Sequence, residues 1–218
     1  MAILNNSIVL QNATGTIGNF YVRKFRGKKI LVTRNPVHRK SKSAAAVKGR
    51  NNFSAVISLA VEANKVTEIK DIWKTANVEG SSPFQRMIKN NLKRVNNGVL
   101  TPSNIITPDG LPLTINSISV ENNILKLGFN LPSIVNIHFP ANLFILFFFN
   151  KYDRPVFSMN SKIDEPSADG TYNKNITISE PIKKAFKVDS NPIIYVAAAG
   201  STLLKKKEYW TKTAAMQL

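Results

Sequence analysis

Eleven lysines and arginines, and no carboxylate, occupy the first 61 residues of this 218-residue chain, in which the first acidic residue is Glu62. A solvated surface normally mixes both signs of charge, so a block of one sign raises the local electrostatic potential and favours an anionic partner. The pattern predicts ionic contact with the phosphates or carboxylates of a polyanion. The basic block, as we call it, consists of Arg23, Lys24, Arg26, Lys28, Lys29, Arg34, Arg39, Lys40, Lys42, Lys48 and Arg50.

Aromatic residues are interleaved with the start of the basic block. Phe20, Tyr21 and Phe25 are the predicted stacking partners if nucleic-acid bases bind there. Three interpretations of the block remain open. It binds nucleic-acid phosphates, or an acidic protein surface such as a neighbouring copy, or it only keeps the protein soluble. Because no RNA-recognition or zinc-finger signature occurs, nucleic-acid contact is expected to be directed to the backbone and independent of sequence.

Residues suited to catalysis or metal binding are few. The chain has no cysteine and only two histidines, His38 in the basic block and His138 in an apolar stretch. Neither a nucleophile elbow nor a phosphate-binding Walker loop is present. The acidic residues Asp164, Glu165 and Asp169 lack the spacing of an EF-hand loop and indicate a solvated turn. We therefore predict a non-enzymatic protein with no catalytic residue, metal, cofactor or small-molecule substrate.

A β-hairpin is predicted to carry the first half of the basic block, with strands over 20–25 and 29–33 and a turn at 26–28. Basic residues fall on both faces of its first strand, so an isolated hairpin would bury too little apolar surface to be stable. We expect it to pack on a neighbouring subunit. The apolar residues predicted to form the subunit-contact arm are Ile3, Leu4, Ile8, Val9 and Leu10.

Helices are predicted after the hairpin, from Ser41 or Ser43 to about Lys65, from a cap at Thr67 through Trp73, and from Ser82 to about residue 96. Residues 99–112 are rich in proline and are predicted to be a linker. Everything beyond them is predicted to be strand, with candidates at 113–120, 124–131, 143–150, 155–159, 171–179, 192–199 and 208–213.

The predicted fold class is α+β. Residues 1–98 form a basic hairpin and small helical region, 99–112 the linker, and 113–218 a β-sandwich of immunoglobulin or fibronectin type, because about seven short strands in this length are typical of such domains. The net charge of +17 is uneven over the chain. This unevenness favours two regions with different roles. The apolar run 143–149 is too short to cross a membrane and indicates a strand buried on both faces.

Three segments together resemble an uncharacterised family of basic proteins from Bacteroidota genomes. They are Gly15-Thr-Ile-Gly18-Asn19-Phe20, a basic and aromatic stretch ending in Arg34-Asn-Pro36, and a helix containing Arg50-Asn-Asn-Phe53. The resemblance implies a glycine-rich N-terminal hairpin, a helix with an Arg-x-x-Phe step and an all-β C-terminal half. It implies no activity.

Two functional hypotheses follow. The first is a structural or assembly protein, such as a component of a phage particle or another homopolymeric assembly, with a homo-oligomer as its working form. The second is a sequence-nonspecific nucleic-acid-binding protein. We expect no signal peptide and no membrane span, hence cytoplasmic synthesis. The final location, in a virion or another particle, is left open.

Overall fold

The computed structural model describes residues 2–3, 15–17, 20–25, 27–33, 41–131, 137–151, 155–163, 171–202 and 208–218. The chain divides into two compact units, Met1–Lys42 and Ser43–Leu218. We describe each unit separately. The fold is mixed helix and sheet with strands predominating, as the α+β prediction required.

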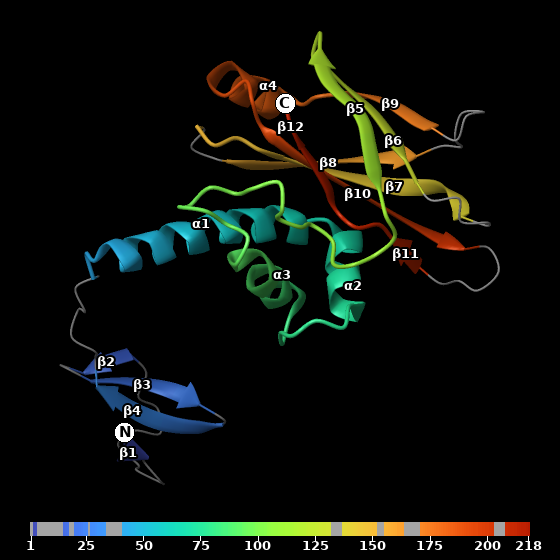
Figure 1. Ribbon diagram of the computed structural model, residues 1–218. Helices are drawn as coiled ribbons and strands as arrows, with labels where there is room; N and C mark the ends of the chain where they lie inside the picture. Colours follow the sequence, from blue (N-terminus) through green and yellow to red (C-terminus); the bar gives the residue numbers. More distant parts are fainter. Residues whose placement is uncertain are drawn as a thin grey trace. The chain divides into compact units, whose positions relative to one another are not determined.

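The first unit is a small antiparallel sheet (Figure 1). Its strands are β1 (Ala2–Ile3), β2 (Gly15–Ile17), β3 (Phe20–Phe25) and β4 (Lys28–Thr33), in the spatial order β1-β4-β3-β2. The predicted hairpin is confirmed as the β3–β4 pair. Gly27 sits in its turn with a φ of +80°, a conformation that glycine adopts without strain. The two short outer strands were not predicted.

Three helices open the second unit: α1 (Ala44–Asn64), α2 (Thr67–Thr75) and α3 (Pro83–Leu92). The predicted caps hold for the first and third, because the Ser43 hydroxyl accepts from the Ala46 amide and the Ser82 hydroxyl from the Gln85 amide, each at 3.3 Å. The cap predicted at Thr67 is wrong. Thr67 is already helical, and α2 begins after Val66 without a side-chain cap.

Two antiparallel sheets follow. One has the order β11-β10-β7-β8, with β12 also paired to β10, and the other has the order β5-β6-β9. Their strands are β5 (Thr114–Glu121), β6 (Ile124–Asn130), β7 (Ile137–Phe148), β8 (Val156–Ile163), β9 (Thr171–Thr177), β10 (Ile193–Thr202), β11 (Glu208–Trp210) and β12 (Ala214–Gln217). All seven predicted strand regions contain strand. The last, predicted over 208–213, is strand only as far as Trp210, and β12 lies beyond the predicted region.

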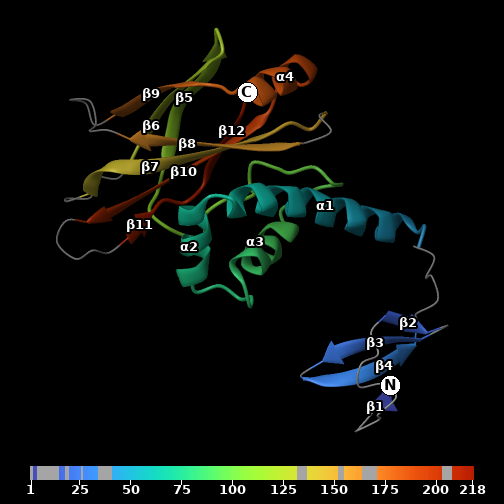
Figure 2. The ribbon, with the colours of Figure 1, turned by 180° about the vertical axis from the view of Figure 1, so that it is seen from behind.

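The larger sheet is covered on both faces (Figures 1 and 2). Along β7, Phe144, Leu146 and Phe148 join the core made with the three helices. The alternate residues of the run 143–149 join a second core with the three-stranded sheet. Side chains alternate across a strand, so the whole run is buried. The prediction of a strand buried on both faces is confirmed.

Residues 99–112 are packed into the structure and do not form the predicted linker. Leu100 and Ile106 are buried with the helices. The Trp73 indole donates to the Ile106 carbonyl oxygen at 2.8 Å, and the Tyr195 hydroxyl donates to the Thr101 carbonyl oxygen at 2.8 Å. This segment therefore connects the helices to the sheet through side chains. Because the helices and sheets share a core, the division of the chain lies at 42/43 and not between 98 and 113.

One helix interrupts the region predicted to be entirely strand. Helix α4 (Glu180–Val188) has a proline in its first turn and buries Ile182 and Ala185 against the second core. The spacing of these two residues with Phe186 is helical. The signal for a short helix was therefore present in the sequence.

Arg86 holds the end of α2 to α3. Its guanidinium donates to the carbonyl oxygens of Trp73 and Lys74 at 2.8 Å, and to those of Ala76 and Gly80 at 3.0 Å. These bonds satisfy carbonyls that a helix C-terminus leaves without intrahelical partners.

We expect Arg86→Ala to lower the free energy of unfolding by about 2–3 kcal/mol, because the variant cannot form several charge-assisted hydrogen bonds at once. Urea unfolding followed by circular dichroism measures this. The control is Lys89→Ala on the same helix, which removes only an exposed ion pair with Glu79 and should cost under about 1 kcal/mol. Equal losses of stability in the two variants would show that Arg86 has no special role.

Candidate polyanion-binding surface

The hairpin gathers part of the basic block at its turn end. In the β3–β4 register Lys24 lies opposite Lys29, and Phe25 lies opposite Lys28, while Arg23 pairs with Ile30 one step further from the turn. Two lysines at directly opposed positions repel one another and destabilise a strand pair. An anion bound at this end of the sheet would offset that repulsion. The strand register therefore places several basic residues at the turn end of the hairpin, whereas the sequence alone shows only their number.

The exposed residues of this surface combine charge with aromatic area. Arg23 and Lys24 are exposed, and Phe20 is 45% exposed at the other end of β3. Tyr21 is half-buried. Successive residues of a strand point to opposite faces, so Phe20 and Tyr21 cannot form one continuous stacking platform. The predicted stacking role is therefore best supported for Phe20.

The remaining described members of the basic block lie near the start of α1. Lys42 ends the first unit, and Lys48 and Arg50 are exposed in the early turns of the helix. The first turn of α1 contains no acidic residue. Cations near a helix N-terminus oppose the helix dipole, which an anionic partner would relieve. The basic block is thus divided between two units.

Several predicted residues fall outside the part of the chain that the structure describes, or are described only by their backbone. Ile3 lies in β1 opposite Ile30, and His138 lies in β7 opposite Ser201. Lys28, Lys29 and Phe25 are placed by strand register alone. Outside the described residues lie Leu4, Ile8, Val9, Leu10, Arg26, Arg34, His38, Arg39, Lys40, Asp164, Glu165 and Asp169.

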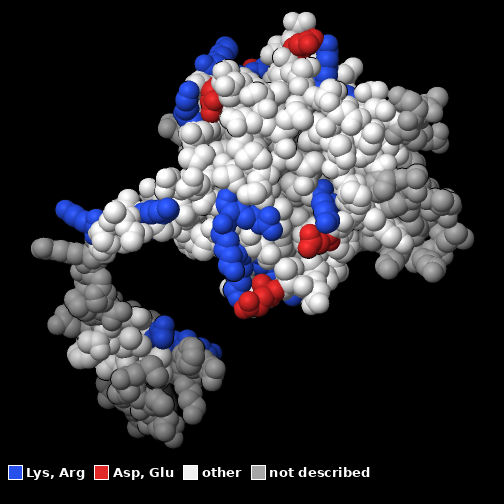
Figure 3. Space-filling view, in the orientation of Figure 1, with Lys and Arg blue, Asp and Glu red and all other residues white. Residues whose placement is uncertain are grey.

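A second group of basic side chains gathers over α3 (Figure 3). Most of these side chains form hydrogen bonds or ion pairs with other residues of the protein. Arg86 binds the carbonyls described above, Lys89 pairs with Glu79 at 2.5 Å, and Arg94 donates to the carbonyl oxygens of Asn90 and Ser103. The hydrogen bond and charge of Lys89 lower the pKa of the Glu79 carboxyl. This group is therefore a less suitable polyanion surface than the hairpin.

Two carboxylates are buried among the described residues. Asp189, at 5% exposed, accepts from the backbone amides of Lys151 and Asn191. Glu62 is 7% exposed, accepts from the Lys65 ammonium at 2.6 Å, and lies 3.4 Å from the Ser158 hydroxyl. Such pairing satisfies a buried charge and gives it a structural role. Over the described ranges, no group of His, Asp or Glu could hold a metal ion, and no helix is long and apolar enough to span a membrane.

The chain matches no protein-family model and no curated protein.

Proposed function

We propose that the protein is a non-enzymatic structural or assembly component, such as part of a phage particle or another homopolymeric assembly. Its N-terminal unit would contact a polyanion or an acidic surface of a neighbouring subunit. The proposal is supported chiefly by how little surface the described residues of the N-terminal unit bury. Among the residues of this unit whose exposure is described, Ile30 alone is buried, at 2% exposed. A unit of about 40 residues rarely stays folded without a disulfide, a metal or a partner.

The edges of the first sheet support addition of a neighbour's strand. Strand β2 pairs with residues 20–22 of β3, and β1 pairs with Ile30 and Leu31 of β4. Among the described residues, this leaves 23–25 of β3, and 28–29 and 32–33 of β4, without an outer partner strand. Unpaired strand edges offer a row of hydrogen-bonding groups to another chain. The basic residues near the hairpin turn on these two edges would select an acidic neighbour or a polyanion.

The strand order of the second unit supports an immunoglobulin- or fibronectin-like sandwich as part of the proposal. Counting from β5, the first, second and fifth strands form one sheet. The third, sixth and last strands lie in the other, with β8 beside β7, and with β11 and β12 pairing successive parts of β10. This distribution supports an immunoglobulin-type sandwich, because variable-type domains of that class add a strand beside the third. Sandwiches of this type commonly serve as interaction modules, an inference from fold analogy.

Replacing the apolar arm tests the assembly proposal. We expect serine at Ile3, Leu4, Ile8, Val9 and Leu10 to leave a folded, soluble protein that no longer forms large species in analytical ultracentrifugation. The matched control places serine at the polar positions Asn5, Asn6, Gln11 and Asn12 and should assemble normally. A full chain that is monomeric at every concentration, or an arm variant that assembles as before, would contradict the proposal.

The second candidate function is sequence-nonspecific nucleic-acid binding. It is favoured by the charged turn end of the hairpin together with the exposed Phe20 ring. Lysine and arginine contacts to phosphates release counterions, so such binding weakens steeply with salt. A monomer that retards DNA of unrelated sequences to the same extent would favour this function over assembly.

A further inference from the structure

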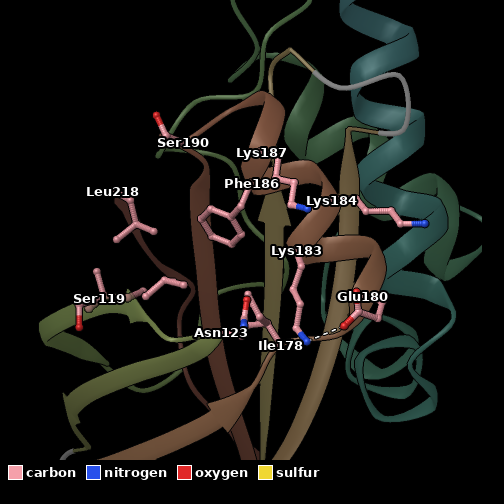
Figure 4. A pocket seen from close by; sticks show the side chains of 12 residues that line it. Ser119, Asn123, Ile178, Glu180, Lys183, Lys184, Phe186, Lys187, Ser190 and Leu218 are labelled. Atoms are coloured by element: carbon pink, nitrogen blue, oxygen red, sulfur yellow. Dashed lines mark hydrogen bonds and ion pairs between the residues drawn. The ribbon is translucent and has the colours of Figure 1, made fainter.

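An open groove of about 850 Å³ lies between β5, α4 and Leu218 in the second unit (Figure 4). It forms on the side of the sandwich where β5 ends one sheet and β12 ends the other. No pairing joins these two strands among the described residues. Residues that pack on the core between the two sheets are therefore accessible to solvent along this side.

The floor of the groove is apolar. Ile118 and Val120 of β5, Phe186 of α4 and Leu218 line it, and each is half-buried against the second core. In Figure 4, Phe186 lies between α4 and the Leu218 side chain. Apolar area left open beside an ordered core is typical of a binding groove.

The α4 side of the groove is positively charged. Three lysines and one carboxylate line it. The Lys183 ammonium forms an ion pair with the Glu180 carboxylate at an N–O distance of 2.6 Å. Lys184 and Lys187 are exposed and form no ion pair with any described residue. The hydrogen bond and charge of Lys183, with smaller contributions from Lys184 and Lys187, hold the pKa of the Glu180 carboxyl below its ordinary value. The groove therefore already stabilises one carboxylate.

The β5 side of the groove offers backbone groups. Strand β5 pairs with β6 along one edge, and within the described ranges no strand pairs with its outer edge. Residues 118–120 of this strand line the groove. An extended segment can add to such an edge through main-chain hydrogen bonds, while its alternate side chains enter pockets beside it.

We propose that this groove binds an extended, acidic peptide segment of a partner protein. The segment adds to the outer edge of β5, places apolar side chains on Phe186 and Leu218, and brings a carboxylate to Lys187. Lys184 adds positive charge from the far side of α4, where its side chain extends away from Phe186 (Figure 4). The N-terminal unit of another copy is a poor occupant, because residues 1–42 carry no carboxylate and would repel the lysines. The strand edge favours a peptide over an anionic lipid, which has no main-chain groups to pair. This surface is independent of the assembly proposal.

The test uses the full chain and a fluorescently labelled peptide, acetyl-Glu-Val-Glu-Ile-Asp-Val-Glu-amide, with anisotropy as the readout. We expect saturable binding that weakens at least tenfold in the double variant Lys184→Glu/Lys187→Glu. The matched control is Lys70→Glu/Lys74→Glu, which makes the same charge change at two exposed lysines of α2, a helix of the same length. The control should bind within about twofold of the unsubstituted chain.

Two further measurements examine the mode of binding. The peptide should slow hydrogen exchange at amides within residues 118–120, and N-methylation of alternate peptide residues should weaken binding at least tenfold. Equal weakening in both lysine variants would overturn the proposal, because attraction would then be general to a basic protein. Unchanged exchange at β5, or stronger binding of decanoate than of the peptide, would also overturn it, the latter in favour of a lipid site.

Discussion

Retention on heparin at physiological ionic strength is expected to disappear when Arg23, Arg26, Lys28 and Lys29 are replaced together by serine. The register places the described members of this set at one end of the β3–β4 hairpin. Each ionic bond to a phosphate or sulfate contributes about 0.9 to the dependence of log affinity on log salt, so the four substitutions should lower this dependence by about 3–4. The measurement is elution salt on heparin, repeated with DNA.

The control for this experiment removes the same charge from the second unit. Serine at Lys70, Lys74, Lys93 and Lys151, all exposed, should move the elution position only slightly. If the hairpin variant is retained as strongly as the unsubstituted protein, polyanion binding by the hairpin is refuted. The charge of the basic block would then be explained by solubility alone.

A second large effect is expected when the chain is cut at two different places. Residues Ser43–Leu218 expressed alone should unfold cooperatively in urea, because this unit contains both cores. Residues 113–218 alone should aggregate. Without the helices, one face of the larger sheet is exposed, including the side chains of Phe144, Leu146 and Tyr195.

Circular dichroism and static light scattering of both fragments check this expectation. The same logic applies to limited proteolysis. A cut within 99–112 should not release a stable C-terminal fragment, since Leu100 and Ile106 belong to the shared core. A soluble fragment 113–218 with a cooperative transition would show that the sandwich folds independently of the helices.

Local patterns in the sequence predicted most elements. Ser43, and Ser82 followed by Pro83 and Gln85, are capping signals that act within one turn, and the structure retains them. Strand positions followed from short apolar runs between turn residues. Such signals need only neighbouring residues, so a single sequence contains them.

The linker prediction failed because the interactions of residues 99–112 are long-range. Prolines and the Asp109-Gly110 turn do prevent regular pairing there. The segment is instead fixed by polar side chains such as the buried Asn91, whose amide donates to the Ile105 carbonyl oxygen and whose side-chain oxygen accepts from the Ile105 amide. No local pattern indicates that an irregular segment will be held in this way.

The candidate sites likewise combine features that the sequence shows directly with features that depend on long-range packing. The charge of the basic block is visible as composition, whereas its division at Lys42 depends on which segments pack together. The groove could not be predicted at all, because it joins residues near 118, near 184 and at 218. None of these three places in the sequence carries a motif that indicates a binding site.

The double coverage of β7 has a consequence for how the chain folds. Strand β7 pairs with β10, which begins at Ile193 and leaves the ribosome about 45 residues later. During that interval the run 143–149 can be covered on one face by α1–α3 while its hydrogen-bonding edge still lacks β10. A strongly apolar strand waiting for a distant partner is prone to intermolecular pairing. We infer that the helices, which are synthesised before the sheet, would cover one face of this apolar strand until β10 emerges to pair with its edge.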